Sequence, residues 1–274
     1  MYEAHWNFAN KPFAHSSDPR YYYPSESHQG ALLKLRYAVE SKRGAALLSG
    51  APGLGKTLLI NGLLRQLPES FTPKVHLVFP QMPPDQLLAY LAGELTQAGP
   101  SSDTVLTIET SIRKIQNTLS RNTASGQHCV IAIDEAHLLT DSTTFETLRL
   151  ILNLEHDGQP TVTMILAGQP TLLPSINRLE GFEERLGVKC LLRPFSPDET
   201  ASYISHRLNA GGATQTVFTN EAIETIHHLA AGVPRKINRL CDLALLIAFA
   251  DEQTTIGADR IEDVSDELIK VAPE

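Results

Sequence analysis

Residues 50–57 read GAPGLGKT, and the apolar run AALLSG (45–50) leads into them. Three glycines within these eight residues let backbone N–H groups turn inward and form a concave nest that binds anions. The run LLINGLLRQL (58–67) follows with helical periodicity, and the N-terminus of a helix adds to the attraction for an anion. The stretch therefore predicts a buried strand, a phosphate-binding loop and a helix, in that order.

The last two residues of the loop indicate what it binds. Lys56 would place a positive charge beside the β and γ phosphates of ATP, and the Thr57 hydroxyl would ligate Mg²⁺. We therefore expect ATP and Mg²⁺ as the cofactors. The residues expected to line the nucleotide here are Gly50, Ala51, Pro52, Gly53, Leu54, Gly55, Lys56, Thr57 and Leu58.

A second hydrophobic run, CVIAIDEAH (129–137), brings two carboxylates to the end of a predicted strand. In a parallel sheet the ligand site lies at the carboxyl ends of the strands, so both acids would lie near the phosphates. We expect Asp134 to hold Mg²⁺ through water. We expect Glu135 to orient and deprotonate the attacking water.

Apolar runs of strand length alternate with helical patterns through the first two thirds of the chain. The further strands are expected at VHLVF (75–79), VTMILAG (162–168) and VKCLL (188–192), and helices over 84–98, 107–119 and 143–154. This alternation predicts an α/β fold with a parallel five-stranded sheet, helices on both faces and right-handed crossovers.

After Pro194 the strand pattern ends, and a small all-helical domain is expected. Ser196 and Glu199 form a capping-box pattern that begins its first helix. The four expected helices cover 197–210, 220–231, 233–251 and 258–271. The predicted division is an aromatic N-terminal segment (1–43), an ATPase core (44–195) and a helical lid (196–274).

Two polar residues are candidates for sensing the γ-phosphate. Gln169 ends a predicted strand and could bond the attacking water or the phosphate, although a simple turn amide would look the same. Arg235, in GVPRKIN (232–238), would lie at a helix start, where the helix dipole mildly disfavours a cation. The γ-phosphate across a domain cleft would resolve that conflict, so Arg235 is expected to contact the nucleotide.

Arg178 and Arg185 lie just before the last predicted strand. Either could reach the ATP of a neighbouring subunit and neutralise transition-state charge, and Arg185, closer to the strand, is preferred. The alternative for Arg185 is a solvated side chain that pairs with Glu183 or Glu184.

Composition narrows the class of protein. The 274 residues carry a formal net charge of −8, which weakens the case for nonspecific DNA binding. Three scattered cysteines argue against a disulfide framework or a zinc site. No run approaches the roughly 20 apolar residues of a membrane-spanning helix, and the first residues do not resemble a signal peptide. We expect a cytoplasmic protein without direct membrane insertion.

Together these motifs resemble the AAA+ superfamily of P-loop ATPases, and more closely the secretion-pathway ATPases of the ExeA/GspA type. The resemblance covers nearly the whole sequence. It includes DPRYYYPSESH (18–28), IDEAH (133–137), LRLILNLE (148–155), LRPFSPDET (192–200) and GVPRKINRLCDLAL (232–245). It implies that the N-terminal aromatic segment and His28 flank the adenine, with Pro12 and Phe13 nearby. Where His137 stands, the family often has glutamine.

Two classes of function follow from the resemblance. One is an ATPase that forms a homo-oligomer, as a ring or filament, and couples nucleotide turnover to a protein partner in secretion or envelope assembly. The other is a DNA-binding ATPase of the transposition type, because soluble ATPases of that kind resemble the same core. A basic stripe facing a central pore would favour the second, and Arg113 and Lys114 are candidates for it. The acidic composition favours the first.

Overall fold

The computed structural model describes residues 2–14, 19–96 and 107–270. Asp18 and the ends of two predicted helices (97–98 and 271) lie outside the described residues. The chain forms two compact units. The sheet unit comprises Ser27–Pro52 and Lys56–Leu192, and the helical unit comprises Met1–Glu26, Gly53–Gly55 and Arg193–Glu274.

Five parallel strands build the sheet, in the order β2-β3-β6-β1-β7. Their bounds are Ala45–Ser49 (β1), Lys74–Leu77 (β2), Cys129–Ile133 (β3), Val162–Gly168 (β6) and Leu186–Leu191 (β7). Every residue of β1, β3 and β6 is buried, which explains why these strands are continuous apolar runs. The predicted parallel five-stranded sheet is confirmed, and β6 lies between β1 and β3.

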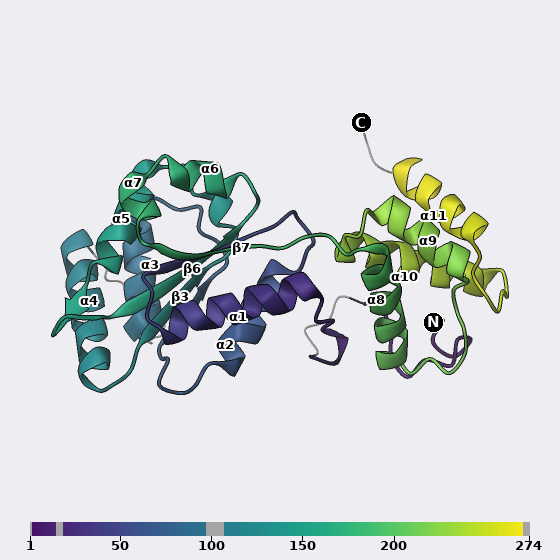
Figure 1. Cartoon of the computed structure of the whole chain (residues 1–274), viewed down its shortest axis with the longest axis horizontal. Helices are drawn as coiled ribbons and strands as arrows, with labels where there is room; N and C mark the ends of the chain where they lie inside the picture. Colours follow the sequence, from purple (N-terminus) through teal and green to yellow (C-terminus); the bar gives the residue numbers. More distant parts are fainter. Residues whose placement is uncertain (1, 15–18, 97–106, 271–274) are drawn as a thin grey trace. The chain divides into compact units, whose positions relative to one another are not determined.

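Helices cover both faces of this sheet (Figure 1). On one face lie α1 (Glu26–Glu40) and α2 (Lys56–Gln66). Leu47, Ile131 and Met164 face the other side, where they belong to one large hydrophobic core. The helices that contribute to that core are α3 (Pro84–Thr96), α4 (Ile108–Ala124), α5 (Ser142–Leu152), α6 (Leu172–Asn177) and α7 (Glu180–Glu183).

Some short elements were not anticipated from the sequence. The two-residue strands β4 (Glu155–His156) and β5 (Gln159–Pro160) form an antiparallel pair. The helices α6 and α7 fill the segment between β6 and β7. Two 3₁₀ turns complete the described elements, Pro19–Tyr21 (η1) and Ala136–Leu138 (η2).

The helical unit contains the four helices expected at the end of the chain. They are α8 (Pro197–Ala210), α9 (Asn220–Ala230), α10 (Pro234–Ala250) and α11 (Ala258–Lys270). The predicted capping box begins α8: the Glu199 backbone N–H donates to the Ser196 hydroxyl, and the Glu199 carboxylate accepts from the Ser196 backbone N–H. Both ends of the box satisfy backbone donors that the helix itself leaves unpaired.

Residues near the N-terminus form part of the helical unit's core. Figure 1 shows this segment, in dark purple, beside the helices of the unit. Trp6 is fully buried and its indole N–H donates to the Leu245 carbonyl oxygen at 3.2 Å. The Tyr2 hydroxyl bonds the Asp242 carboxylate. Hydrophobic burial and these polar contacts hold the segment against α10.

Arg207 on α8 holds the same segment at a second point. Its guanidinium is buried, with Nε donating to the Pro12 carbonyl at 2.6 Å and a terminal nitrogen donating to the Ala14 carbonyl at 2.8 Å. The ring of Tyr21 lies 4.6 Å from the guanidinium carbon, close enough for a cation–π interaction. The buried charge is therefore balanced by carbonyl dipoles and aromatic rings.

This packing divides the chain differently from the predicted segments. Residues 1–26 belong to the helical unit, whereas most of α1 belongs to the sheet unit, so the expected 1–43 segment is not one body. The physical reason is the burial of Trp6 and Phe13 among apolar side chains of the terminal helices. Near the expected boundary at residue 195, the sheet unit ends at Leu192 and the helical unit continues from Arg193.

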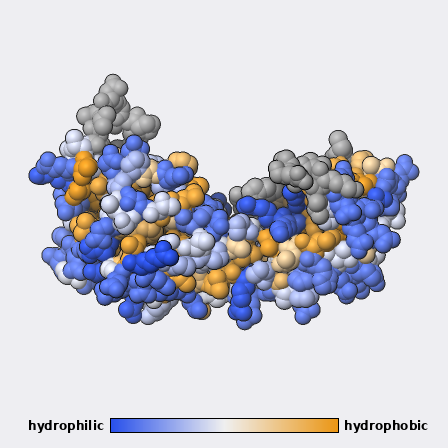
Figure 2. Space-filling model, turned by 90° about the horizontal axis from the view of Figure 1, so that it is seen from above, coloured by the Kyte–Doolittle hydropathy of each residue, from blue (hydrophilic) through white to orange (hydrophobic). Residues whose placement is uncertain are grey.

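Hydrophilic residues cover much of the face shown in Figure 2, with hydrophobic patches between them. Within the ranges 2–14, 19–96 and 107–270, no helix is long and apolar enough to cross a membrane.

Candidate nucleotide-binding site

The phosphate loop joins β1 to α2. Gly53 and Gly55 adopt positive φ angles of 83° and 89°, which glycine reaches without the strain of a side chain. Lys56 begins α2 and is 6% exposed. Its ammonium group donates to the carbonyl oxygens of Gly50 and Ala51, at 2.9 and 3.2 Å. The lysine thus bonds its own loop after β1, where the sequence predicts that a phosphate binds.

Asp134 follows β3 and is almost fully buried. Its Oδ2 accepts a hydrogen bond from the Thr57 hydroxyl at 2.5 Å, and its Oδ1 accepts from the Glu135 backbone N–H at 2.9 Å. Burial acts to raise the pKa of Asp134, but His76, Thr57 and the Glu135 N–H together outweigh it and hold the pKa below its usual range. The carboxylate therefore stays ionised at neutral pH.

The chemistry of this pair suits Mg²⁺. Thr57 and Asp134 offer two oxygen donors in contact with each other, one of them a buried anion, and Mg²⁺ takes oxygen ligands. Among the described residues, no group of three or more histidine, cysteine or acidic side chains could hold a metal alone. A site with one carboxylate fits Mg²⁺ better than other metals, because Mg²⁺ keeps several waters and uses substrate phosphates as further ligands.

His76 on β2 also belongs to this region, and sequence reasoning missed it. Its Nε2 lies 3.9 Å from the Asp134 Oδ2, beyond hydrogen-bond distance. β2 and β3 are neighbouring parallel strands, and His76 is paired in register with Ala132, two residues before Asp134. The available signal was the single polar residue in the run VHLVF.

Gln169 lies at the end of β6, between the strands that carry the phosphate loop and the two acids. Its amide nitrogen is 2.8 Å from His137 Nε2. His137 Nδ1 in turn lies 3.3 Å from Glu135 Oε2. Glu135 itself adopts a left-handed backbone conformation with φ 49°, which is strained for a residue other than glycine. The structure thus brings Gln169 and Glu135 to the two sides of one histidine.

Arg235 is the second residue of α10, as expected for a side chain at a helix start. Within the helical unit its backbone N–H donates to the Gly53 carbonyl at 3.3 Å. A Cβ atom at Gly53 would come within 2.9 Å of the Arg235 Cβ. Gly53 is part of the phosphate loop, so Arg235 lies directly beside one of the residues expected to bind phosphate.

The two arginines proposed to act on a neighbouring subunit are both exposed. Arg178 directly follows α6 as its C-cap residue, and Arg185 lies between α7 and β7. Glu183, a possible partner for Arg185, instead bonds Lys189 at 2.5 Å. Among the described residues no ion pair joins Arg185 to Glu183 or Glu184, which weakens the alternative of a paired surface side chain.

The residues expected near the adenine lie in different units. Phe13 is buried in the helical unit, where its ring packs against Phe218 and lies near Arg207. His28 is buried on α1, which belongs to the sheet unit. The role of Phe13 and His28 at the adenine stays a prediction. Leu58, expected to line the nucleotide after the phosphate loop, is exposed on α2.

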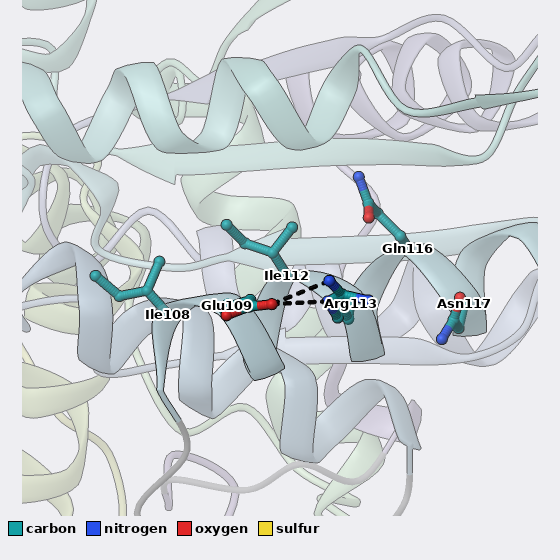
Figure 3. A pocket seen from close by; sticks show the side chains of 6 residues that line it. All are labelled: Ile108, Glu109, Ile112, Arg113, Gln116 and Asn117. Atoms are coloured by element: carbon teal, nitrogen blue, oxygen red, sulfur yellow. Dashed lines mark hydrogen bonds and ion pairs between the residues drawn. The ribbon is translucent and has the colours of Figure 1, made fainter.

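One of the two positive charges of the basic stripe considered from the sequence is paired with an acid. Arg113 pairs with Glu109 one helical turn away on α4, at 3.0 Å. Figure 3 shows the two side chains joined across a surface hollow that is lined by α4 alone, with Ile108 and Ile112 beside them. None of these lining residues belongs to the phosphate loop or the acidic motif, so this hollow is not the nucleotide site.

Comparison with known proteins shows the family of the chain. Residues 39–176 match the family model described as AAA domain. The chain is 36% identical over 253 residues to General secretion pathway protein A of Aeromonas hydrophila. That alignment covers 91% of this chain and 45% of the relative, so the chain spans less than half of the length of that protein.

Solved structures share the fold at low sequence identity. Cdc6p from Pyrobaculum aerophilum superposes with a TM-score of 0.73 at 14% identity, covering 96% of this chain and 74% of that one. The Aeropyrum pernix ORC2 protein, solved as ADPNP and ADP complexes, gives a TM-score of 0.70 at 15% identity and covers 95% of this chain and 72% of that one. At these identities the likeness concerns the fold alone.

Proposed function

Because the chain belongs to the AAA domain family, we propose that it binds ATP with Mg²⁺ and hydrolyses it to ADP and phosphate. The observation that supports this most is the contact between the Thr57 hydroxyl and the buried, ionised Asp134 carboxylate, next to a lysine at the phosphate loop. A hydroxyl and a carboxylate supply oxygen ligands for Mg²⁺, and an ammonium group at a phosphate loop supplies a charge for the phosphates.

The proposed roles follow from position. The phosphate loop and Lys56 bind the β and γ phosphates, while Thr57 and Asp134 hold Mg²⁺, which neutralises phosphate charge. Glu135 accepts a proton from a water that attacks the γ-phosphorus, and the bond between that phosphorus and the ADP oxygen breaks. Gln169 orients the water or the phosphate. Arg235 contacts the γ-phosphate from its place beside Gly53.

Nucleotide binding and turnover test this proposal together. Calorimetric titration with ATP is expected to show one site per chain, with affinity that depends on Mg²⁺. Asp134→Asn removes the anionic metal partner and keeps the side-chain shape, so the Mg²⁺ dependence should weaken. Steady hydrolysis by the unaltered protein, with none in the absence of Mg²⁺, is the expected result. Tight ATP binding that ignores Mg²⁺ would contradict the assigned metal site.

We also propose that ATP drives self-association and that the assembly acts on a protein partner, as the similarity to a secretion-pathway protein suggests. The net charge of −8 and the pairing of Arg113 with Glu109 favour a protein over DNA. Arg185, exposed and without an ion pair to its neighbouring acids in the described chain, is available to reach a second copy.

Mass photometry of the Glu135→Gln protein separates the two classes of partner. This variant keeps ATP bound, so assemblies that depend on ATP should accumulate. Oligomers that form with Mg²⁺ and ATP alone, unchanged by duplex DNA, support a protein partner. Oligomers that require duplex DNA would replace this view with the DNA-binding alternative.

A further inference from the structure

Three polar side chains form a continuous line at the end of β6. The Gln169 amide nitrogen is 2.8 Å from His137 Nε2, and His137 Nδ1 is 3.3 Å from Glu135 Oε2. The three residues come from two separate strand ends, 32 residues apart between His137 and Gln169. The imidazole is mostly shielded, with its side chain 13% exposed, whereas the Glu135 side chain is 44% exposed.

The chemistry of Gln169 fixes the proton on the ring. The Gln169 amide nitrogen only donates, so His137 Nε2 must offer it a lone pair, and the hydrogen of a neutral imidazole then lies on Nδ1. That Nδ1 lies 3.3 Å from Glu135 Oε2, a close polar contact without the geometry of a hydrogen bond. The amide orientation, the tautomer and the carboxylate are therefore mutually consistent.

The backbone around this line is built to keep it in place. The 3₁₀ turn Ala136–Leu138 packs against the end of β6, and a Cβ at Gly168 would lie 3.0 Å from the His137 backbone nitrogen. Only glycine at position 168 gives the turn room to approach. Glu135, directly before the turn, has a left-handed backbone conformation, and its Oε2 lies 3.3 Å from His137 Nδ1.

We propose that His137 is a positioning residue that couples Gln169 to Glu135. This inference rests on the proposed ATPase function and adds a residue to it. Gln169 sets the tautomer of the ring, and the ring orients the Glu135 carboxylate toward the attacking water. The contact between the sensor and the base therefore runs through His137, and the ring acts through these two neighbours.

Three substitutions of His137 separate the contributions of its two ring nitrogens. His137→Asn places an amide near the position of Nδ1 and can reach Glu135 only. His137→Gln places an amide near Nε2 and can reach Gln169 only. His137→Phe keeps the ring volume and removes both contacts, so a purely structural role would tolerate it best.

The expected result is a change in turnover without a change in binding. His137→Phe should lower kcat about tenfold, because a misplaced catalytic group costs this much or more, while ATP affinity stays within twofold. His137→Asn should retain more turnover than His137→Phe. His156→Phe is the matched control. That histidine also lies beside an acid, Asp157, but it belongs to neither the phosphate loop nor the acidic motif. Unchanged kcat in His137→Phe overturns the proposal.

A double-mutant cycle tests the coupling itself. Gln169→Leu should lower kcat less in the His137→Phe background than in the unaltered protein, because residues that act through each other are not additive. Fully additive effects would show that Gln169 and His137 act separately, which overturns the relay.

A tautomer measurement tests the contact without relying on activity. In protein labelled with ¹⁵N-histidine, the His137 signal, assigned by its loss in His137→Gln, should show a hydrogen on Nδ1 and none on Nε2. Gln169→Leu should change the Nε2 shift. A hydrogen on Nε2 in the unaltered protein overturns the inference even if the protein hydrolyses ATP. Absence of ATP turnover with the expected tautomer would instead refute the proposed function and leave the inferred contact standing.

Discussion

Buried charges serve different ends in the two units. In the helical unit, Arg207 reaches the carbonyl oxygens of Pro12 and Ala14, which are 195 and 193 residues away along the chain. In the sheet unit, the Lys56 ammonium reaches the carbonyls of Gly50 and Ala51, five or six residues away. Arg207 therefore fastens a distant segment, whereas these contacts of Lys56 hold only its own loop.

The contrast gives a criterion for separating structural from functional charges. A buried cation that joins remote parts of the chain contributes mainly to stability, since its loss frees a segment. A buried cation that, like Lys56, donates to the carbonyls of a phosphate loop at the end of a strand contributes mainly to ligand binding. Substitutions can break or sharpen this distinction.

The largest effect is expected for Lys56→Ala. Removing the charge that faces the β and γ phosphates should weaken ATP binding about a thousandfold, or about 4 kcal/mol. The melting temperature should change little. Lys74→Ala is the matched control, because the Lys74 ammonium also donates to two backbone carbonyls, of Leu64 and Leu67, outside the site. Calorimetric ATP titration of both variants checks the prediction. An equal loss of ATP affinity in the two variants would contradict the distinction between structural and functional charges.

Arg207→Ala should have the opposite profile. Loss of the guanidinium leaves the Pro12 and Ala14 carbonyls without their buried donor, so the free energy of unfolding should fall by about 3–4 kcal/mol. Limited proteolysis should then cut within the first residues. ATP affinity of the folded fraction should stay near that of the unaltered protein. Unchanged resistance to denaturant would show that the N-terminal segment is held by hydrophobic burial alone.

His128 offers a third kind of buried polar group, one that is neutral. It is buried and bonds the Thr163 hydroxyl at 2.9 Å. Burial, helped by the positive charge of Lys42, lowers its pKa to about 4. The unfolded chain takes up a proton near pH 6.5 and the folded one only near pH 4, so stability falls as pH drops between these values.

Through His128, the free energy of unfolding should fall by about 2–3 kcal/mol between pH 7 and 4.5. Denaturant melts of the unaltered protein and of His128→Gln across this range provide the measurement. The variant should be less stable at pH 7 and should lose less stability on acidification. Parallel pH curves for the two proteins would show that His128 does not titrate with unfolding.

The smallest effect concerns two glycines with opposite surroundings. Gly62 lies within α2 and a Cβ there meets nothing within 4 Å, so Gly62→Ala should stabilise the protein by about 0.5–1 kcal/mol. Gly53 has φ 83° and a Cβ there would crowd Arg235, so Gly53→Ala should destabilise it and weaken ATP binding. Melting temperatures of the two variants and the unaltered protein, measured in parallel, check both predictions. A stabilised Gly53→Ala would contradict the close approach of Arg235.

Much of the sheet unit could be predicted because its signals are local. The buried strands β1, β3 and β6 are uninterrupted apolar runs, and the glycines, Lys56 and Thr57 of the loop stand together in the sequence. The parallel sheet then requires that the ends of β1, β3 and β6 lie at one edge, which brings Asp134 to Thr57. The apolar pattern and the parallel topology together were sufficient to predict that Asp134 lies near the phosphate loop.

Contacts between distant residues could not be predicted in the same way. Nothing in the first residues indicates that Trp6 donates to Leu245 or that Arg207 binds the Pro12 carbonyl. The contact of His137 with Gln169 depends on how a 3₁₀ turn packs on β6, which no periodicity encodes. The strands β4 and β5 were missed because two residues cannot show an alternating pattern.

The central claim is that ATP bound at the phosphate loop is hydrolysed with Glu135 as the base. Single-turnover release of phosphate from preloaded ATP and Mg²⁺, compared between the unaltered protein and Glu135→Gln, tests it most directly. We predict equal ATP loading of the two proteins and release at least about a hundredfold slower in the variant, the lower end of what a positioned base typically contributes. Equal release rates, or no release from the unaltered protein, would contradict the account.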